Sequence, residues 1–218
     1  MKEKFMNGLL TLAVVLMMQL LWWFGIHGPN VMSAVTTPFM TKMMAQNLEL
    51  YQAGEGITAS GVFYTAGSKY SIIANPFASG WFSSTGSGIT MGLIVAIMLF
   101  SKRDDFKAIA KLAIPCGIFN INEPIIFGIP MVMNAMFAVP FFLAPVACVC
   151  CGYLVQSLGL CPLFVIDVPW TTPVGLFGFL ASSGNIMGAI WQAVIILGVS
   201  TLIYTPFVIA ANRQEAAA

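Results

Sequence analysis

Long apolar runs separated by short polar clusters dominate this chain, and they predict helices that cross a membrane. The first run extends from Phe5 to Ile26 without an ionisable residue, and about 20 apolar residues suffice to cross a hydrocarbon core. It ends in bulky aromatic residues where a signal peptide would have a small-residue cleavage site, so we predict a retained helix. Two later runs, Ala135 to Leu160 and Ile186 to Ala211, predict further spanning helices.

The stretch from Pro29 to Gly86 contains no run that is long and apolar enough to span. Prolines, glycines and charged residues interrupt it, and it predicts only a short amphipathic helix around Thr36 to Leu50. We expect that helix to lie on the membrane surface or against protein. The apolar run from Ser87 to Phe100 is too short to span and is typical of half of a broken or re-entrant element.

The segment from Leu112 to Met133 is apolar, yet a simple spanning helix would not tolerate its polar and helix-breaking residues. These are Pro115, Asn120, Asn122, Glu123, Pro124 and Pro130. Broken backbone survives at membrane depth only where it lines a protein-walled cavity. We therefore predict a re-entrant loop with Asn120, Asn122 and Glu123 at its tip, and a second broken region from Cys161 to Gly184.

Composition and charge identify the surroundings of these helices. Hydrophobic residues make up 59% of the chain and charged residues 8%, whereas soluble domains average about 25% charged. The net charge of +1 indicates neither a nucleic acid nor an acidic partner. Four basic residues between Lys102 and Lys111 predict a cytoplasmic loop, and Arg213 predicts the same side for the C-terminus. The fold class predicted is an all-α membrane protein with spanning helices plus broken, re-entrant hairpin segments.

Three residues in the apolar segments are candidates for function, each with a structural alternative. An intramembrane carboxylate such as Glu123 is a functional-site hypothesis by default, against a structural ion pair. His27 at a helix end is either functional or an interfacial or core residue with satisfied hydrogen bonds. Trp170 is either a ligand platform or an interface anchor. The five cysteines are more typical of small packed hydrophobes than of a metal site, so we expect no metal and no cofactor.

Four motifs follow one another in an order that resembles one known family. They are WWFGIHGPNVMSAVTTPF (Trp22 to Phe39), STGSGIT (Ser84 to Thr90), IFNINEPIIFGIPMVMN (Ile118 to Asn134) and VPWTTP (Val168 to Pro173). The chain resembles the membrane component, enzyme IIC, of the lactose/cellobiose/diacetylchitobiose-type phosphoenolpyruvate-dependent sugar phosphotransferase systems. The resemblance extends over essentially the whole chain.

That resemblance implies a multi-pass protein of the inner (cytoplasmic) membrane that binds a β-linked disaccharide from outside. A separate soluble phosphocysteine protein of the enzyme IIB type would phosphorylate the sugar as it is released, so the chain would act in phosphorylation only with that donor. The resemblance implies catalytic roles for His27 and Glu123. The expected sugar-binding residues are Gly28, Asn120, Asn122 and Trp170.

Family members are longer chains, and this sequence resembles only their C-terminal half. We expect residues 1–218 to form a single transmembrane domain equivalent to the substrate-binding half, with the N-terminal half absent. Its partners would be the disaccharide, the donor protein, membrane lipid, and a separate N-terminal half or a second copy. One alternative is a truncated or accessory half-transporter without independent transport activity, and another is a membrane enzyme that uses Glu123 and His27 as an acid–base pair.

Overall fold

The computed structural model describes residues 2–58, 61–65 and 67–216, and most of these residues are helical. The α-helices are α1 (Lys2–Trp23), α2 (Gly28–Gln52), α3 (Asn75–Trp81), α4 (Met91–Phe100), α5 (Asp104–Ile118), α6 (Glu123–Gly128), α7 (Ala135–Ser157), α8 (Leu176–Ala181), α9 (Ile186–Ala193) and α10 (Ser200–Ala216). A 3-10 turn, η1 (Ser87–Ile89), precedes α4, and a π-helical segment, η2 (Val194–Val199), joins α9 to α10. Strands β1 (Ile57–Thr58) and β2 (Gly61–Val62) pair antiparallel, with Ile57 opposite Val62.

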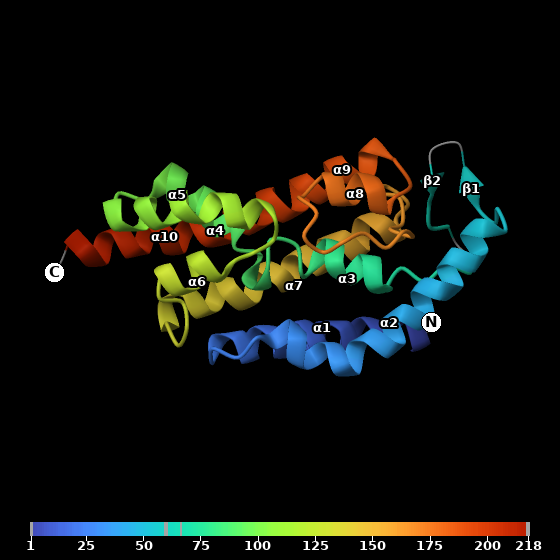
Figure 1. The fold of residues 1–218 in the computed structure, drawn as a ribbon, viewed down its shortest axis with the longest axis horizontal. Helices are drawn as coiled ribbons and strands as arrows, with labels where there is room; N and C mark the ends of the chain where they lie inside the picture. The colour runs from blue at the N-terminus through green and yellow to red at the C-terminus, as the bar shows by residue number, and fades with distance from the viewer. Residues whose placement is uncertain (1, 59–60, 66, 217–218) are drawn as a thin grey trace.

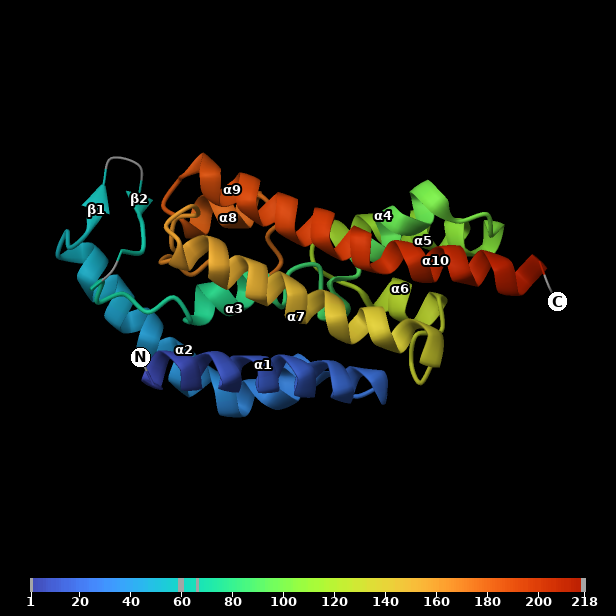
Figure 2. The ribbon, with the colours of Figure 1, turned by 180° about the vertical axis from the view of Figure 1, so that it is seen from behind.

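The long helices lie side by side along one axis of an elongated bundle (Figure 1). Helices α1 and α2 form one side, α7 runs through the middle, and α10 with α4 and α5 forms the other side. The view from behind shows the same order, with the β-hairpin at one end and the C-terminal end of α10 at the other (Figure 2). The short helices α3, α6 and α8 lie between these layers.

Among the described residues, two continuous helices are long and apolar enough to cross a membrane, namely Ala135–Ser157 and Ile186–Arg213. They run in opposite directions, so the start of α7 and the C-terminal end of α10 lie at the same end of the bundle. The loop before α5 lies at that end as well (Figure 1). The predicted re-entrant segment starts and finishes at that end too, because α5 and α6 fold back before α7 begins. This arrangement agrees with the common side that the basic residues predict for Lys102 to Lys111 and Arg213.

Helix α2 is longer than the predicted helix around Thr36 to Leu50, since it begins at Gly28 and ends at Gln52. His27 caps its first turn and Pro29 fits there without losing a helical hydrogen bond, so the helix starts directly after α1. It packs antiparallel against α1 at close range. A Cβ atom at Gly28 would lie only 2.0 Å from the backbone oxygen of Met18, so this contact requires glycine.

The buried Gln192 of α9 links this helix to α8 and to α3, and α3 forms part of the cavity wall described below. Its Oε1 accepts hydrogen bonds from the backbone N–H groups of Gly175 and Gly178, at 2.9 and 2.8 Å. Its Nε2 donates to the backbone oxygen of Gly80 at 3.1 Å. Polar backbone groups at helix ends need such partners when they are buried, and Gln192 supplies them for α3 and α8.

Candidate functional site

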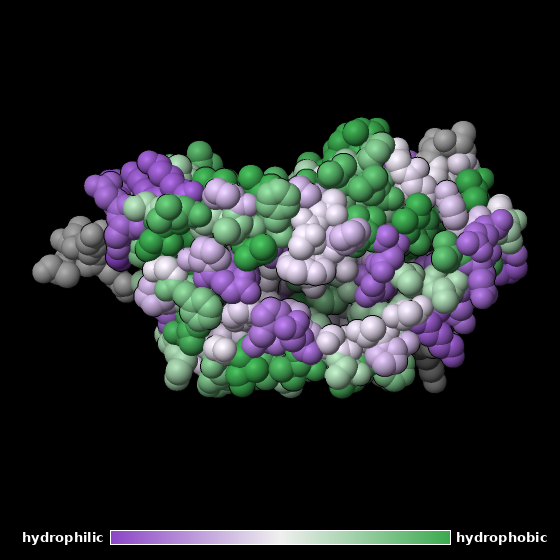
Figure 3. All heavy atoms as spheres, viewed as in Figure 1, coloured by the Kyte–Doolittle hydropathy of each residue, from purple (hydrophilic) through white to green (hydrophobic). Residues whose placement is uncertain are grey.

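A cavity of about 680 Å³ lies between α2, α3 and the tips of the broken segments. The surface view shows a hollow in the middle of this face, bordered by polar and intermediate residues, while strongly hydrophobic residues gather above and below it (Figure 3). Five of the six site residues expected from the sequence line this one cavity, from three separate parts of the chain. They are His27, Asn120, Asn122, Glu123 and Trp170.

The two ionisable residues of the cavity wall face each other. His27 Nε2 lies 4.0 Å from Glu123 Oε1, and both side chains are somewhat more than two-fifths exposed, at 42% and 43%. The His27 ring is held from two sides, because its Nδ1 accepts the N–H of Asn30 at 3.3 Å and its ring centroid lies 4.8 Å from that of Trp22. With Nδ1 used as an acceptor, the proton of a neutral imidazole resides on Nε2, the nitrogen nearer Glu123.

Glu123 reaches the cavity because a short helix begins at the tip of the re-entrant segment. It is the first residue of α6, and Pro124 follows in the first turn, where a missing backbone N–H costs nothing. The apolar side chains of Ile125 and Ile126 behind it are buried and anchor α6 against its neighbours. The local sequence thus places the carboxylate at the exposed start of an otherwise anchored helix.

Asn120 uses its whole side-chain amide to hold three backbone segments together. Its Oδ1 accepts the N–H of Thr85 at 2.7 Å, and its Nδ2 donates to the oxygens of Trp170 and Thr172 at 2.5 and 2.9 Å. Its φ of 66° lies in the left-handed region, which asparagine tolerates better than most residues. Both amide protons are occupied, so the geometry favours a positioning role for Asn120 over direct sugar contact.

Asn122 forms a second link between the NINEP segment (Asn120 to Pro124) and the STGSGIT motif (Ser84 to Thr90). Its Nδ2 donates to the backbone oxygen of Ser87 at 2.6 Å. The approach is so close that a Cβ at Gly86 would lie 2.3 Å from the Asn122 Cγ. Thr85, Gly86, Gly88 and Ile89 all have positive φ, so the STGSGIT motif forms an unusual buried turn that receives the NINEP tip. The two motifs therefore build one part of the cavity wall together.

Trp170 and Gly28 differ sharply in their surroundings. Trp170 is 58% exposed and lines the cavity, while its backbone oxygen is held by Asn120, an arrangement that leaves an aromatic face open to a ligand. Gly28, expected from the resemblance to contact sugar, is buried and is not among the residues that line the cavity. Its contact with Met18 gives it a packing role instead.

Sequence reasoning missed the polar residues that line the other half of the cavity. Helix α2 contributes Asn30, Ser33, Thr36 and Thr37, and the chain from the start of α3 contributes Asn75, Ser79 and Ser83. Polar positions three or four residues apart could have indicated a polar helix face. That signal was hidden because α2 starts eight residues earlier than the amphipathic helix that we predict.

Comparisons with known proteins agree with this architecture. The family model described as "Phosphotransferase system, EIIC" matches residues 4–145. The chain is 37% identical to the cellobiose-specific EIIC component of Lactococcus lactis, over 94% of this chain and 43% of that protein. It is 35% identical to the oligo-beta-mannoside-specific EIIC component of Bacillus subtilis, over 95% of this chain and 44% of that protein.

A solved structure extends the match to three dimensions. The crystal structure of ChbC, the IIC component from the N,N'-diacetylchitobiose-specific phosphotransferase system, superposes with a TM-score of 0.83 at 33% identity, covering 95% of this chain and 45% of that one. The predicted fold class is thereby confirmed. The chain spans less than half the length of the curated relatives it matches. With the matched family model and the shared fold together, the chain belongs to the phosphotransferase system EIIC family, in its lactose/cellobiose/diacetylchitobiose-type branch, whose members are integral membrane components.

Proposed function

We propose that this chain binds a β-linked disaccharide in the cavity and presents it for phosphorylation during uptake. The observation that supports this most strongly is the pairing of His27 and Glu123, 4.0 Å apart, at a cavity that Trp170 also lines. Similar proteins are named as specific for cellobiose, oligo-beta-mannoside and lactose. A partly open, mostly uncharged cavity with one aromatic face and one carboxylate suits a neutral sugar.

The chemistry assigned to the pair is general base catalysis of phosphoryl transfer. A sugar hydroxyl placed between the two side chains would accept a hydrogen bond from His27 Nε2 and donate one to Glu123. As the hydroxyl oxygen bonds to phosphorus and the phosphorus–sulfur bond of the donor breaks, the hydroxyl proton moves to the Glu123 carboxylate. Asn122 would contact the sugar from the adjoining wall, and Asn120 would hold Trp170 and the STGSGIT turn in register.

The partners and the membrane arrangement belong to the same proposal. The phosphoryl group would come from a soluble phosphocysteine protein of the enzyme IIB type, approaching from the end of the bundle where α5 begins and α10 ends. Residues 1–218 would form one multi-pass transmembrane domain in the inner (cytoplasmic) membrane, surrounded by lipid. A separate N-terminal half or a second copy of the chain would complete the transporter.

Replacing Glu123 with Gln tests the proposal directly, because Gln retains the size of the side chain and removes the base. In a strain that supplies the donor protein but lacks its own disaccharide carrier, the Glu123→Gln chain should accumulate in the membrane at the wild-type level. Its rate of sugar phosphorylation should fall by about 10²–10⁴-fold, the usual contribution of a general base. Glu49→Gln on the exposed side of α2 is the matched control. Normal phosphorylation by the Glu123→Gln chain would show that the Glu123 carboxylate takes no part in the reaction.

The alternative to this proposal is a half-transporter that is inactive by itself. The same strain separates the two. Uptake by this chain alone supports an independent transporter, whereas uptake only after a second chain is supplied supports the half-transporter. Sugar binding to the isolated chain without uptake would agree with the second candidate and still retain the site.

A further inference from the structure

The buried turn of the STGSGIT motif uses its hydrogen-bond acceptors inside the protein and leaves several of its donors unused. Four successive backbone oxygens, from Thr85 to Gly88, each accept a hydrogen bond. Their donors, in the same order, are Thr90 Oγ1, the Ile89 N–H, Asn122 Nδ2 and Tyr204 Oη, at 3.2, 3.1, 2.6 and 2.7 Å. The oxygens of this turn therefore have no further need of a ligand, and any unmet requirement lies with its donors.

Ser87 carries most of these unused donors. Within the part of the chain that the structure describes, its Oγ has no hydrogen-bond partner, although the residue is only 3% exposed. The backbone N–H groups of Ser87 and Gly88 also find no partner among the described residues. Buried donors are normally paired, because an unpaired one loses its bonds to water without replacement. Three neighbouring donors without partners indicate a place for a ligand that accepts hydrogen bonds.

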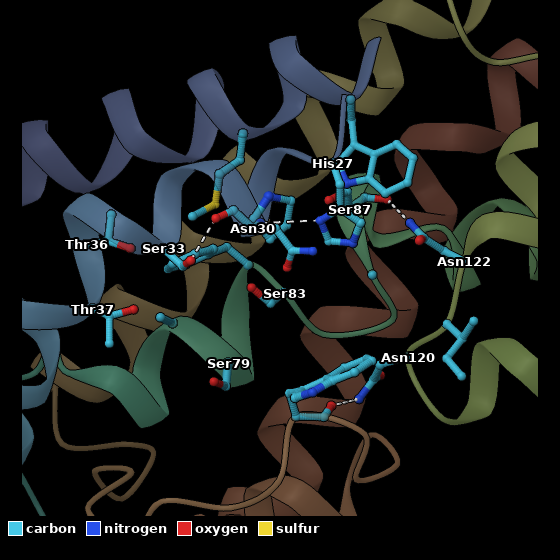
Figure 4. Close-up of a pocket in the computed structure, with 18 of the residues that line it drawn as sticks. His27, Asn30, Ser33, Thr36, Thr37, Ser79, Ser83, Ser87, Asn120 and Asn122 are labelled. Carbon is cyan, nitrogen blue, oxygen red and sulfur yellow. Dashed lines mark hydrogen bonds between the residues drawn. The ribbon is translucent and has the colours of Figure 1, made fainter. Parts of the chain in front are cut away.

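These donors lie beside the residues that carry the proposed chemistry. Ser87 lines the same cavity as His27 and Glu123, and Asn122, which holds its backbone oxygen, directly precedes Glu123 in the chain. Figure 4 shows this bond to Asn122 at the end of the cavity where His27 lies. The sign of φ changes from negative at Ser87 to +80° at Gly88, and a change of this kind gathers successive N–H groups into a concavity that suits an anion.

The unused groups also define the chemistry of their ligand. A sugar hydroxyl both donates and accepts, whereas a phosphoryl group has three oxygens that accept and carry negative charge during transfer. Among the described residues that line the cavity, none is a lysine or an arginine, and Glu123 adds a negative charge. Neutral donors fixed at Ser87 are therefore the groups available beside His27 to stabilise charge on the phosphoryl oxygens.

We propose that the Ser87 hydroxyl, with the N–H groups of Ser87 and Gly88, binds the phosphoryl group as it passes from the donor protein to the sugar. This inference rests on the proposed function, because it concerns the same transfer. The sugar oxygen forms a bond to phosphorus while the phosphorus–sulfur bond breaks. The electron pair of that bond goes to the cysteine sulfur as a thiolate, and the hydroxyl proton of the sugar goes to Glu123. The three donors keep their own protons and stabilise the phosphoryl oxygens throughout.

The first test uses orthovanadate as a mimic of the phosphoryl group, on the purified 218-residue chain in lipid nanodiscs. Calorimetry measures cellobiose affinity with and without vanadate. In the wild type, vanadate should raise cellobiose affinity about tenfold, as expected for hydrogen bonds to a charged group. In Ser87→Ala, cellobiose affinity without vanadate should stay within twofold of the wild type, and vanadate should have no effect. The thermal midpoint of Ser87→Ala should not fall, because the hydroxyl that is removed has no internal partner.

The second test measures phosphorylation at saturating cellobiose, in the strain that supplies the donor protein. Removal of one donor from a site that stabilises transition-state charge lowers kcat by about 10²-fold, and we expect a fall of this size for Ser87→Ala with an unchanged KM. Ser84→Ala is the matched control, because Ser84 is a buried serine of the same motif that does not line the cavity. It should retain both the vanadate effect and a rate within about threefold of the wild type.

The outcomes separate the phosphoryl site from the proposed function. A vanadate effect that is present in the wild type and lost in Ser87→Ala supports the site. A wild-type chain that binds cellobiose without any effect of vanadate overturns the site, while sugar binding stands. Weaker cellobiose binding by Ser87→Ala without vanadate also overturns it, since Ser87 would then contact the sugar. A normal kcat for Ser87→Ala has the same consequence. If the wild type phosphorylates no sugar by itself, the calorimetry decides alone, and if it binds no cellobiose, the proposed function fails.

Discussion

Asn120 offers the sharpest test of how the site is assembled, because its side chain joins the three segments that form one wall. Asn120→Ala removes three hydrogen bonds and leaves the N–H of Thr85, in a residue only 1% exposed, without its partner. Each lost bond costs about 1 kcal/mol, and alanine at a φ of 66° costs a further ~1 kcal/mol. The total is about 4 kcal/mol, or roughly a 10 °C fall in thermal midpoint for a chain of this size.

Two companion variants separate the backbone effect from the hydrogen bonds. Asn120→Gly relieves the backbone conformation but still lacks the amide, so its midpoint should lie slightly above that of Asn120→Ala. Asn120→Asp keeps an acceptor for Thr85 but turns an oxygen toward two backbone oxygens, so it should also be destabilised. Thermal unfolding in nanodiscs and cellobiose binding are measured on each variant. Lost sugar affinity with an unchanged midpoint would refute the positioning role and make Asn120 a direct sugar ligand.

Four further variants test other parts of the structure. Gln192→Leu removes the buried links to α3 and α8, and we expect a loss of about 3 kcal/mol or more in the free energy of unfolding, seen as a lower thermal midpoint. Gly86→Ala would place a Cβ 2.3 Å from the side chain of Asn122 at a φ of 78°, so sugar affinity should fall at least about tenfold through displacement of Asn122. The last two variants are made in a chain whose native cysteines are replaced, and they test the orientation in the membrane. Lys107→Cys should react with an impermeant thiol reagent only from the cytoplasm, and Lys69→Cys should react only from outside. The reverse pattern would refute the orientation.

Much of the architecture was accessible from local patterns. The two later apolar runs matched helices that are long and apolar enough to span, within a few residues, whereas the apolar part of the first run forms a shorter helix, Gly8–Trp23. The prolines and polar residues of Leu112 to Met133 indicated that the segment turns back. The length of α2 was not accessible in the same way. Its first turns are stabilised by the His27 cap and by packing on α1, whereas Pro38 and the weak apolar periodicity of the segment favour a shorter helix.

The internal partners of the site residues were beyond any local pattern. Asn120 binds Thr85 across 35 positions, and Gln192 binds Gly80 across 112. Helical periodicity reports which residues share a face, but it does not report which distant backbone group a side-chain amide meets. A sequence motif records which residues are present and not which groups they contact. The resemblance therefore identified the motifs that line the cavity but did not distinguish the roles of the residues within them.

Hydrogen-bond partners divide the polar residues of this cavity into two groups. A broken segment in an apolar environment leaves backbone groups that must be satisfied inside the protein, and the amides of Asn120 and Asn122 serve that need. Polar groups that remain after the backbone is satisfied have no structural reason to lie in a membrane domain, because each carries a desolvation cost. Glu123 and the hydroxyls of Thr37, Ser79 and Ser83 belong to this second group. A ligand rich in hydroxyl groups would satisfy all of them at once, which agrees with the sugar that we propose for this cavity.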